Sequence, residues 1–544
     1  MSKYTIGVDY GTNSVRALIV DIQTGEEISS SVWDYASVPT GVWLSDADVH
    51  LARQHPADYQ QGLYESVRGA LAAAKGLDVA NVIGIWIDTT GSTPLPIDED
   101  GIALALKPEF KGNLHAMAWL WKDHTGHAEA AEITEKAASY PYLQKCGGTY
   151  SSEWFLSKIL RCKRVAPDVF AAAYSWVELQ DYVHAWLTGK VKPNQIPRGI
   201  CAAGHKAMFH EAWGGLPSKE FLTTLDPALA DLRDRLYDTT QTADQSAGEL
   251  LPEHAEKLGL PAGITVAVGA FDAHLGAVGS GVKPGTLVKI MGTSTCDIMI
   301  GDAATPDIQG VCGVVPGSVV PGYLGIEAGQ SAVGDLFNWL VAQFGSEHAT
   351  LNEEALKLTP GESGLVALDW NNGNRTILVD PLLSGLIVGQ TLHTTRAEVY
   401  RALIEATAYG SRKIIERIEE SGVPITEVVV CGGIGEKSPL TMQIYADVLN
   451  RPIKTSRSAQ TCALGSAIMA SVAAGGHPDT LTAIAAMTGT KDEVYTPCPE
   501  AVGTYNKLYQ IYGQLHDAFG IKGTTSDLSQ VMKKLFAIQE GASK

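Results

Sequence analysis

Long apolar runs, paired cysteines and an excess of positive charge are all missing from this 544-residue sequence. No window approaches the roughly 18 uninterrupted apolar residues of a membrane span, and no basic stretch followed by an apolar core indicates a signal peptide. The eight cysteines never form C-x-x-C, which argues against a disulfide framework or a zinc site and favours a reducing compartment. The net charge of −19 disfavours nonspecific contact with nucleic acid. We therefore expect a cytoplasmic protein that acts on small molecules, with neither nucleic acid nor membrane as a partner.

Two common phosphate-binding fingerprints are missing as well. Neither the P-loop pattern G-x-x-x-x-G-K-[ST] nor the dinucleotide pattern G-x-G-x-x-G occurs, and GEKS at residues 435–438 has the wrong spacing. Any phosphate site must therefore be built in another way.

The apolar pattern predicts an α/β architecture. Short strand-like runs alternate with helical patterns, which is typical of that class. The expected strands are residues 6–8, 17–21, 82–87, 265–268, 286–290, 298–300, 322–326 and 427–430. The expected helices are residues 57–74, 151–164, 179–187, 330–344, 395–421 and 440–449. The length predicts two or more domains.

An internal repeat is the most informative feature. GVDYGTNSVRALIVD at residues 7–21 is echoed by VKIMGTSTCDIMIGD at residues 288–302. Each copy reads as a hairpin whose Gly-Thr turn exposes backbone N–H groups and hydroxyls, as in the phosphate hairpins of actin-like ATPases. Only the first copy has a carboxylate, because Asp9 corresponds to Ile290. We predict a duplicated domain with a Gly/Pro-rich hinge at residues 276–285.

A second glycine-rich turn lies in the C-terminal half. EVVVCGGIGEKSPLTMQIYADVL at residues 427–449 combines a strand, the double glycine Gly432-Gly433 and a helix. Bare backbone there could lie flat against a planar group, with a helix N-terminus nearby. An ordinary strand–helix turn explains the same pattern, so this segment alone does not establish a nucleotide site.

Five segments together resemble the FGGY carbohydrate kinases in order and rough spacing. They are DYGTNSVRALIVD (9–21), GAFDAHLGAVG (269–279), IMGTST (290–295), GGIGEKSPLTMQIYADVL (432–449) and ALGSAIMA (463–470). The resemblance covers nearly the whole chain. It implies two actin-like (ribonuclease H-like) ATPase domains with a cleft between them. We place the domains at residues 1–279, on the sugar and Mg²⁺ side, and 283–544, on the nucleotide side.

Within this family, three segments look like the kinases of L-ribulose. They are IDTTGSTPLPID (87–98), WLWKDHTG (119–126) and GHKAMFH (204–210). The resemblance implies ATP-dependent phosphorylation of the terminal hydroxyl of L-ribulose to L-ribulose 5-phosphate, a step of L-arabinose catabolism. Two departures fall in the sugar half. Where many relatives read W-x-D-x-R, this chain has Trp121-Lys122-Asp123-His124 and lacks the arginine, and DTTGST at residues 88–93 replaces their Gln-rich turn.

Asp272 is the expected general base for the attacking hydroxyl. It follows the strand pattern 265–268 and precedes a small-residue segment, which predicts a carboxylate at a strand end. The residue pattern alone favours a helix N-cap instead, for which aspartate is well suited. The family resemblance favours the base.

On the nucleotide side, the resemblance implies ATP and Mg²⁺ as cofactors. Asp9 is the expected anchor of the metal, through water, although a solvated turn aspartate is the alternative. Arg16 fits a phosphate contact and a strand-edge arginine equally well. The expected ATP and phosphate contacts are Gly11, Thr12, Asn13, Ser14, Gly292, Thr293, Gly432, Gly433, Lys437 and Ser438.

On the sugar side, Lys206 and Glu327 stand out with Asp272. Lys206 lies among small and apolar residues, where a cation is costly unless it is paired, and Glu327 ends an apolar strand and leads into a helix. A lysine that extends its ammonium to solvent and a capping glutamate are the alternatives. Three further expected contacts are Ser92, Thr93 and Trp121, of which the tryptophan could equally be a core residue.

Two other functions stay open at this stage. One is a kinase of the same family that acts on xylulose, ribitol or arabitol. The other is an actin-like ATPase without a sugar substrate, such as a chaperone or a filament protein, which shares the hairpin. The segment GAFDAH beside the hinge, together with a sugar-recognition half, favours the kinase. A homodimer is a further open question.

Overall fold

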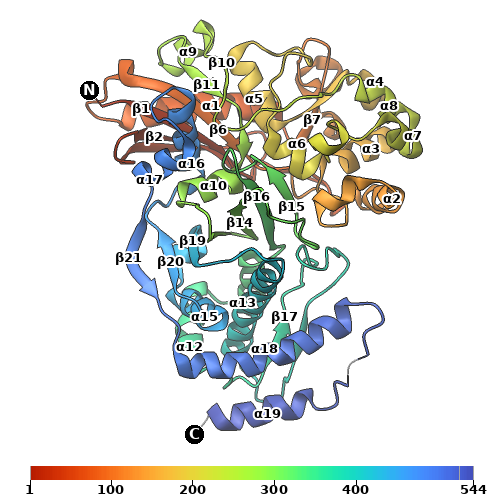
Figure 1. Cartoon of the computed structure of the whole chain (residues 1–544), viewed down its shortest axis with the longest axis vertical. Helices are drawn as coiled ribbons and strands as arrows, with labels where there is room; N and C mark the ends of the chain where they lie inside the picture. Colours follow the sequence, from red (N-terminus) through yellow and green to blue (C-terminus); the bar gives the residue numbers. More distant parts are fainter. Residues whose placement is uncertain (1, 526, 543–544) are drawn as a thin grey trace.

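Two α/β lobes make up the structure, a computed structural model that describes residues 2–525 and 527–542. They are stacked along the long axis of the molecule, with the N-terminal half in the upper part of Figure 1 and most of the C-terminal half below it. Within the described residues, every helix is too short or too polar to serve as a bilayer-spanning segment.

Each lobe is built on a seven-stranded sheet. The N-terminal sheet contains β1 (Tyr4–Tyr10), β2 (Ser14–Asp21), β3 (Glu27–Asp34), β6 (Val82–Thr89), β10 (Ser246–Glu249), β11 (Thr265–Ala267) and β12 (Ala270–Phe271). The C-terminal sheet contains β13 (Thr286–Met291), β14 (Thr295–Gly301), β15 (Gly313–Pro316), β16 (Leu324–Gln330), β19 (Glu427–Cys431), β20 (Ile453–Ser456) and β21 (Thr490–Tyr495).

The two sheets share one strand order. In the first, β3-β2-β1-β6-β11 pair in the sequence antiparallel, antiparallel, parallel, parallel. In the second, β16-β14-β13-β19-β20 pair in the same way. The predicted duplication and the two-domain α/β fold are therefore confirmed, with one hairpin, β1–β2 or β13–β14, at the centre of each sheet.

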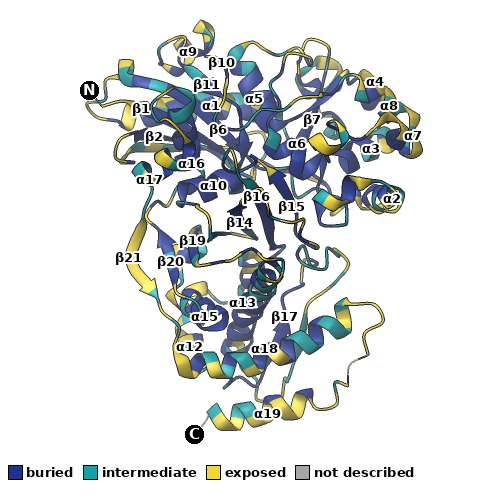
Figure 2. Ribbon diagram, in the orientation of Figure 1, coloured by how far each residue is buried: buried dark blue, intermediate teal, exposed yellow. Residues whose placement is uncertain are grey.

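Helices cover both sheets, so the central strands are buried. Six of the seven residues of β1 are buried, as expected of a strand packed on both faces. Helices that pack on the sheets or join the lobes are α1 (Pro56–Ala73), α5 (Leu179–Thr188), α9 (Pro252–Leu258), α10 (Asp272–Gly279), α11 (Gly334–Gln343), α12 (His348–Leu356), α13 (Arg396–Glu420), α14 (Gly433–Lys437), α15 (Pro439–Leu449), α16 (Thr461–Ala473), α17 (Thr480–Met487), α18 (Pro499–Gly520) and α19 (Val531–Ala542). Figure 2 shows the central strands of the sheets largely buried, whereas the edge strand β21 and the helix α19 are largely exposed.

A helical region with its own core is inserted in the N-terminal half. It lies to the right of the upper sheet in Figure 1. Its helices are α2 (His127–Ala137), α3 (Phe155–Val165), α4 (Pro167–Ala172), α6 (Ile200–Lys206), α7 (Lys219–Leu225) and α8 (Pro227–Arg233). Short strands outside the two large sheets are β4 (Trp43–Leu44), β5 (Ala52–Gln54), β7 (Pro94–Ile97), β8 (Ala118–Trp119), β9 (Ser175–Glu178), β17 (Val366–Leu368) and β18 (Leu386–Val388).

Three sequence-based expectations need correction. The helix expected at 330–344 begins only at Gly334, because β16 continues to Gln330, and Glu327 therefore lies within a strand rather than at its end. The helix expected at 151–164 begins at Phe155. The first four residues of the expected hinge, 276–279, belong to α10. Their small size serves close helix packing rather than flexibility, and only residues 280–285 join α10 to β13.

Candidate active site

A cavity of about 210 Å³ lies between the lobes. Strands and turns from both halves line it, because the two hairpins meet there. Seven of the residues expected at a site line this cavity: Thr12, Trp121, Lys206, Asp272, Gly292, Thr293 and Glu327. The structure thus brings the expected base, residues of both hairpin turns and the expected sugar contacts Trp121, Lys206 and Glu327 into one place.

The two hairpin turns differ in length by one residue. The Gly11 N–H donates to the carbonyl of Ser14, three residues on, at 2.9 Å, whereas the Gly292 N–H donates to the carbonyl of Ser294, two residues on, at 2.9 Å. Thr12 also accepts a hydrogen bond from the indole N–H of Trp121, with 3.1 Å between the heavy atoms. The side-chain amide of Asn13 donates to the carbonyl of Thr40.

The double glycine lies at the start of α14. Gly432 has φ +92°, and a Cβ there would lie 2.5 Å from the Met291 carbonyl oxygen, so a glycine is required. Gly433 has open space beside it. Lys437 is exposed at the end of α14, and the Ser438 hydroxyl accepts a hydrogen bond from the Thr441 N–H as the cap of α15. None of these four residues lines the 210 Å³ cavity.

Asp272 is the first residue of α10, directly after β12. Its Oδ1 accepts a hydrogen bond from the Ala273 N–H at 2.6 Å, so it contacts the helix N-terminus. Burial raises the pKa of this carboxyl to about 7, and the negative charge of Asp9 adds to the effect. A carboxylate in that range can accept a proton near neutral pH.

Asp9 faces a second carboxylate that the sequence analysis did not single out. Asp88 lies opposite Asp9 in the parallel pairing of β1 with β6, and burial raises the pKa of both carboxyls. Arg16 approaches Asp9 at 3.5 Å, and the Ser466 hydroxyl donates to Asp88 at 2.6 Å.

One oxygen of each carboxylate, Oδ1 of Asp9 and Oδ1 of Asp88, is buried and makes no hydrogen bond to the described residues. Two buried carboxylates with unsatisfied oxygens are costly unless a cation approaches them. Oxygen donors of this kind are those that Mg²⁺ prefers, so the donor set fits a magnesium ion.

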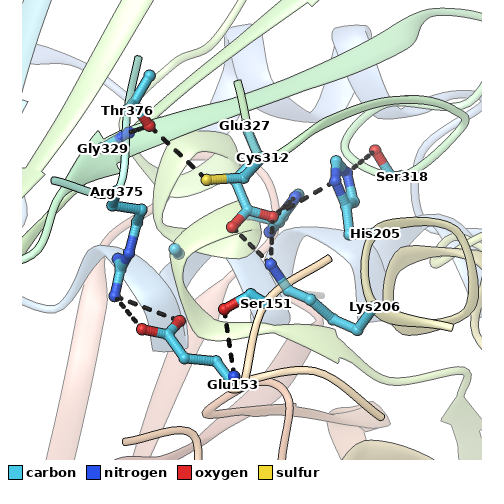
Figure 3. A network of polar contacts seen from close by, with 12 residues as sticks. Ser151, Glu153, His205, Lys206, Cys312, Ser318, Glu327, Gly329, Arg375 and Thr376 are labelled. Atoms are coloured by element: carbon cyan, nitrogen blue, oxygen red, sulfur yellow. Dashed lines mark hydrogen bonds and ion pairs between the residues drawn. The ribbon is translucent and has the colours of Figure 1, made fainter. Parts of the chain in front are cut away.

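Two ion pairs cross the cavity from one half of the chain to the other (Figure 3). The Lys206 ammonium of α6 lies 2.6 and 2.9 Å from the two carboxylate oxygens of Glu327 on β16. The Arg375 guanidinium lies 3.1 and 3.4 Å from those of Glu153. Burial alone would raise the pKa of Glu327, but Lys206 and the nearby histidines outweigh it and lower the pKa to about 2. The partner that the sequence required for Lys206 is therefore Glu327.

A second group of metal-ligating side chains surrounds Glu327. One ligand atom each of His205, His274 and Glu327 lies within 4.8 Å of the others. The Lys206 ammonium already contacts both oxygens of Glu327, and a cation bound there would be repelled by it. These residues consequently fit an organic substrate better than a metal.

Several other side chains lie differently from what the sequence suggested. Ser92 and the Thr93 N–H both donate to Glu178, away from the cavity, whereas Thr90 and Gly91 line it. Asp123, in the segment that lacks the arginine of W-x-D-x-R, pairs with the buried Arg53 of β5 instead.

Asp88, Glu153 and Arg375 are the site residues that sequence reasoning missed. Asp88 had a usable signal, since it closes an apolar strand pattern in a segment already singled out. Arg375 and Glu153 lie outside the large sheets and helices, and their pairing depends on the two lobes meeting. No local sequence pattern predicts such a contact.

Both halves of the chain match one family of enzymes. Residues 4–279 match the N-terminal domain of the FGGY family of carbohydrate kinases, and residues 287–474 match its C-terminal domain. A protein named Ribulokinase from Halalkalibacterium halodurans is 44% identical over 100% of this chain and 99% of its own length. Another of that name from Mycolicibacterium smegmatis is 43% identical, covering 95% of this chain and 94% of its own.

Solved structures share the fold at low identity. A xylulose kinase from Brucella ovis superimposes with a TM-score of 0.79 at 22% identity, covering 94% of this chain and 98% of its own. Plasmodium falciparum glycerol kinase with ADP gives a TM-score of 0.76 at 15% identity, covering 96% and 99%. The strand order, the cavity between the lobes and these matches together lead to one conclusion: the chain belongs to the FGGY family of carbohydrate kinases and uses ATP to phosphorylate a sugar.

Proposed function

We propose that this kinase is a ribulokinase, which transfers the γ-phosphoryl group of ATP to the terminal hydroxyl of L-ribulose and yields L-ribulose 5-phosphate. The names of full-length relatives at 41–44% identity support this substrate. The observation that carries the proposal is the position of Asp272, buried in the inter-lobe cavity with a pKa of about 7, between the hairpin turns and the Lys206–Glu327 pair.

In the proposed mechanism, Asp272 accepts the proton of the attacking hydroxyl. Asp272 lines the 210 Å³ cavity together with residues of both hairpin turns and of the sugar contacts. The attacking hydroxyl and the phosphorus of ATP are therefore held within reach of each other. Phosphoryl transfer requires mainly positioning and charge neutralisation, to which a well-placed base adds roughly 10²–10⁴-fold. Lys206 donates hydrogen bonds to the sugar hydroxyls and Glu327 accepts hydrogen bonds from them. Trp121 covers one side of the sugar.

The ATP contacts come from both halves. The turns Gly11–Ser14 and Gly292–Thr293 hold the β- and γ-phosphates, while Gly432 and Gly433 leave room for the base or ribose, with Lys437 and Ser438 nearby. Asp9 and Asp88 would hold Mg²⁺, directly or through water. When bound, this ion would neutralise part of the phosphate charge. We place the domain division at residues 279–283 and the activity in the cytoplasm, where ATP is available.

A coupled assay of ADP release tests this function. Purified protein is given ATP and Mg²⁺ with no sugar, with L-ribulose, and with xylulose, ribitol or arabitol. L-Ribulose should give the highest kcat/KM, and ADP release without any sugar should be small. A higher kcat/KM on another acceptor would reassign the substrate, and sugar-independent hydrolysis would point to an actin-like ATPase. Sedimentation of the same sample would decide whether the protein is a homodimer.

A further inference from the structure

A second, larger pocket adjoins the catalytic cavity. It has a volume of about 540 Å³ and lies between α2 of the N-terminal half and the segment 372–382 of the C-terminal half. Its walls include Ala128, Val311 and Leu382, and Leu382 is 87% exposed, so this outer pocket opens to solvent. This mainly apolar outer pocket therefore lies next to the polar 210 Å³ cavity.

Among the residues that the structure describes, four line both spaces: Glu153, Lys206, Glu327 and Arg375. They form the two ion pairs that cross the cavity between the lobes. Asp272 and residues of the hairpin turns line the 210 Å³ cavity but not the outer pocket. The boundary between the two spaces therefore consists of charged side chains from both halves of the chain.

The Glu153–Arg375 pair is held firmly at this boundary. Its side chains are only 18% and 15% exposed. The neighbouring Thr376 hydroxyl accepts a hydrogen bond from the Gly329 N–H of β16 at 3.2 Å, which fixes the segment that carries the arginine (Figure 3). The Nε–H of Arg375 is buried and makes no hydrogen bond to the described residues. It is thus free to donate to an oxygen of a bound sugar.

We propose that the Glu153–Arg375 pair, beside Lys206–Glu327, forms the end wall of the acceptor site and limits the length of the sugar that fits. This inference rests on the proposed function. With the reacting hydroxyl at Asp272, the opposite end of the ketose, C1, meets the wall. A longer acceptor must displace the ion pair to reach the apolar outer pocket, and separating a buried pair is costly.

A series of acceptors extended at C1 tests the wall in the wild-type enzyme. L-Ribulose is compared with its 1-O-methyl and 1-O-propyl ethers by ADP release. A pocket of fixed size discriminates by about 10- to 200-fold for each methylene that does not fit, so kcat/KM should fall by roughly 100-fold or more from L-ribulose to the propyl ether. A propyl ether used within about twofold of L-ribulose would overturn the proposal.

Removing the pair should relax this limit. In the double variant Glu153→Ala/Arg375→Ala, no unpaired charge is left, and the propyl ether should be used within roughly tenfold of L-ribulose. The matched control is Lys145→Ala/Asp307→Ala, which removes a 2.6 Å ion pair between the same two halves but lines neither the cavity nor the outer pocket. The control should keep the wild-type ratio.

The outcomes separate the two proposals. A folded double variant, as judged by its melting temperature, that keeps the wild-type ratio overturns the end wall and leaves the ribulokinase assignment intact. If the double variant does not fold, the wild-type series alone decides. An enzyme that phosphorylates neither L-ribulose nor any ether, but accepts another sugar, overturns the proposed substrate and the inference built on it.

Discussion

The two central hairpins have the same topology but opposite chemistry. In the first, Asp9 faces Arg16 across the hairpin and Asp88 on the next parallel strand. At the equivalent place in the second, Ile290 faces Cys296 and Cys431. One sheet thus presents three charged groups where the other presents none. The duplication kept a hairpin at the centre of each sheet, while the carboxylate pair Asp9–Asp88 has no counterpart at the equivalent place in the C-terminal half.

The halves also depend on each other for the rest of the site. Lys206 comes from the first half and Glu327 from the second, and the same holds for Glu153 and Arg375. Asp272 follows the last strand of the first sheet but begins a helix that packs against the second. In the proposed mechanism, the duplicated parts hold phosphate and metal, and the contacts between them recognise the sugar.

The largest effect is expected at the junction of the halves. Asp272→Asn removes the base without changing size, so kcat should fall by about 10²–10⁴-fold while the KM for ATP stays close to wild type. Steady-state kinetics with both substrates varied would measure this. A variant that keeps most of its kcat would show that Asp272 is only the first residue of α10.

The next prediction tests how much the Lys206–Glu327 ion pair between the halves contributes to stability. Lys206→Met leaves Glu327 buried without its ammonium and should lower the free energy of unfolding by about 3–5 kcal/mol. In the double variant Lys206→Met/Glu327→Leu both charges are gone, and the loss should be smaller. Urea unfolding measures both. A double variant less stable than the single one would contradict the argument, and both variants should raise the KM for the sugar.

A matched pair of substitutions tests the contrast between the hairpins directly. Asp9→Asn should raise the Mg²⁺ concentration needed for half-maximal activity by about 10- to 100-fold, the usual cost of removing a group that holds a metal through water. Ile290→Asn at the equivalent position should leave it unchanged. Titration of activity with Mg²⁺ at saturating ATP gives both values. Equal shifts in the two variants would mean that the metal is not confined to the first hairpin.

The smallest effect is in the pH dependence. Asp272 must be ionised to accept a proton, and its raised pKa of about 7 means that a large fraction is protonated in mild acid. The value of kcat/KM should therefore rise with pH, by about tenfold per pH unit on the acid side, and level off above neutrality. If kcat/KM is already independent of pH below neutral pH, the pKa of Asp272 is not raised in the working enzyme.

The sequence predicted the elements of this site better than their contacts. The hairpins could be found because a repeat of Gly-Thr turns is local, and a buried lysine requires a partner wherever that partner lies. Lys206 and Glu327 were both expected at the sugar side, and the structure pairs them, yet the strand of Glu327 was predicted to end too early, before a helix from residue 330. The strand pattern at 82–87 did not reveal Asp88 as a partner of Asp9, because only the pairing of β1 with β6 brings them together.

Ser92 and Thr93 illustrate the limit on the sugar side. Sequence reasoning located the correct segment, but which of its residues line the cavity depends on how the chain turns after β6. The turn directs Ser92 toward Glu178 and leaves Thr90 and Gly91 at the surface of the cavity. Arg375 could not have been predicted, because its role depends on an irregular segment meeting the opposite half.

The crossing of α10 and α16 sets the spacing of Asp272 and Asp88. A Cβ on Gly465 of α16 would lie 1.9 Å from the Leu275 carbonyl oxygen of α10, and one on Gly279 would lie 2.0 Å from that of Thr461. The two helices therefore touch through bare backbone. One begins with Asp272, and the other carries Ser466, which donates to Asp88. A single added methyl group at this crossing would push Asp272 and Asp88 apart, so these glycines set the distance between the proposed base and the proposed metal site.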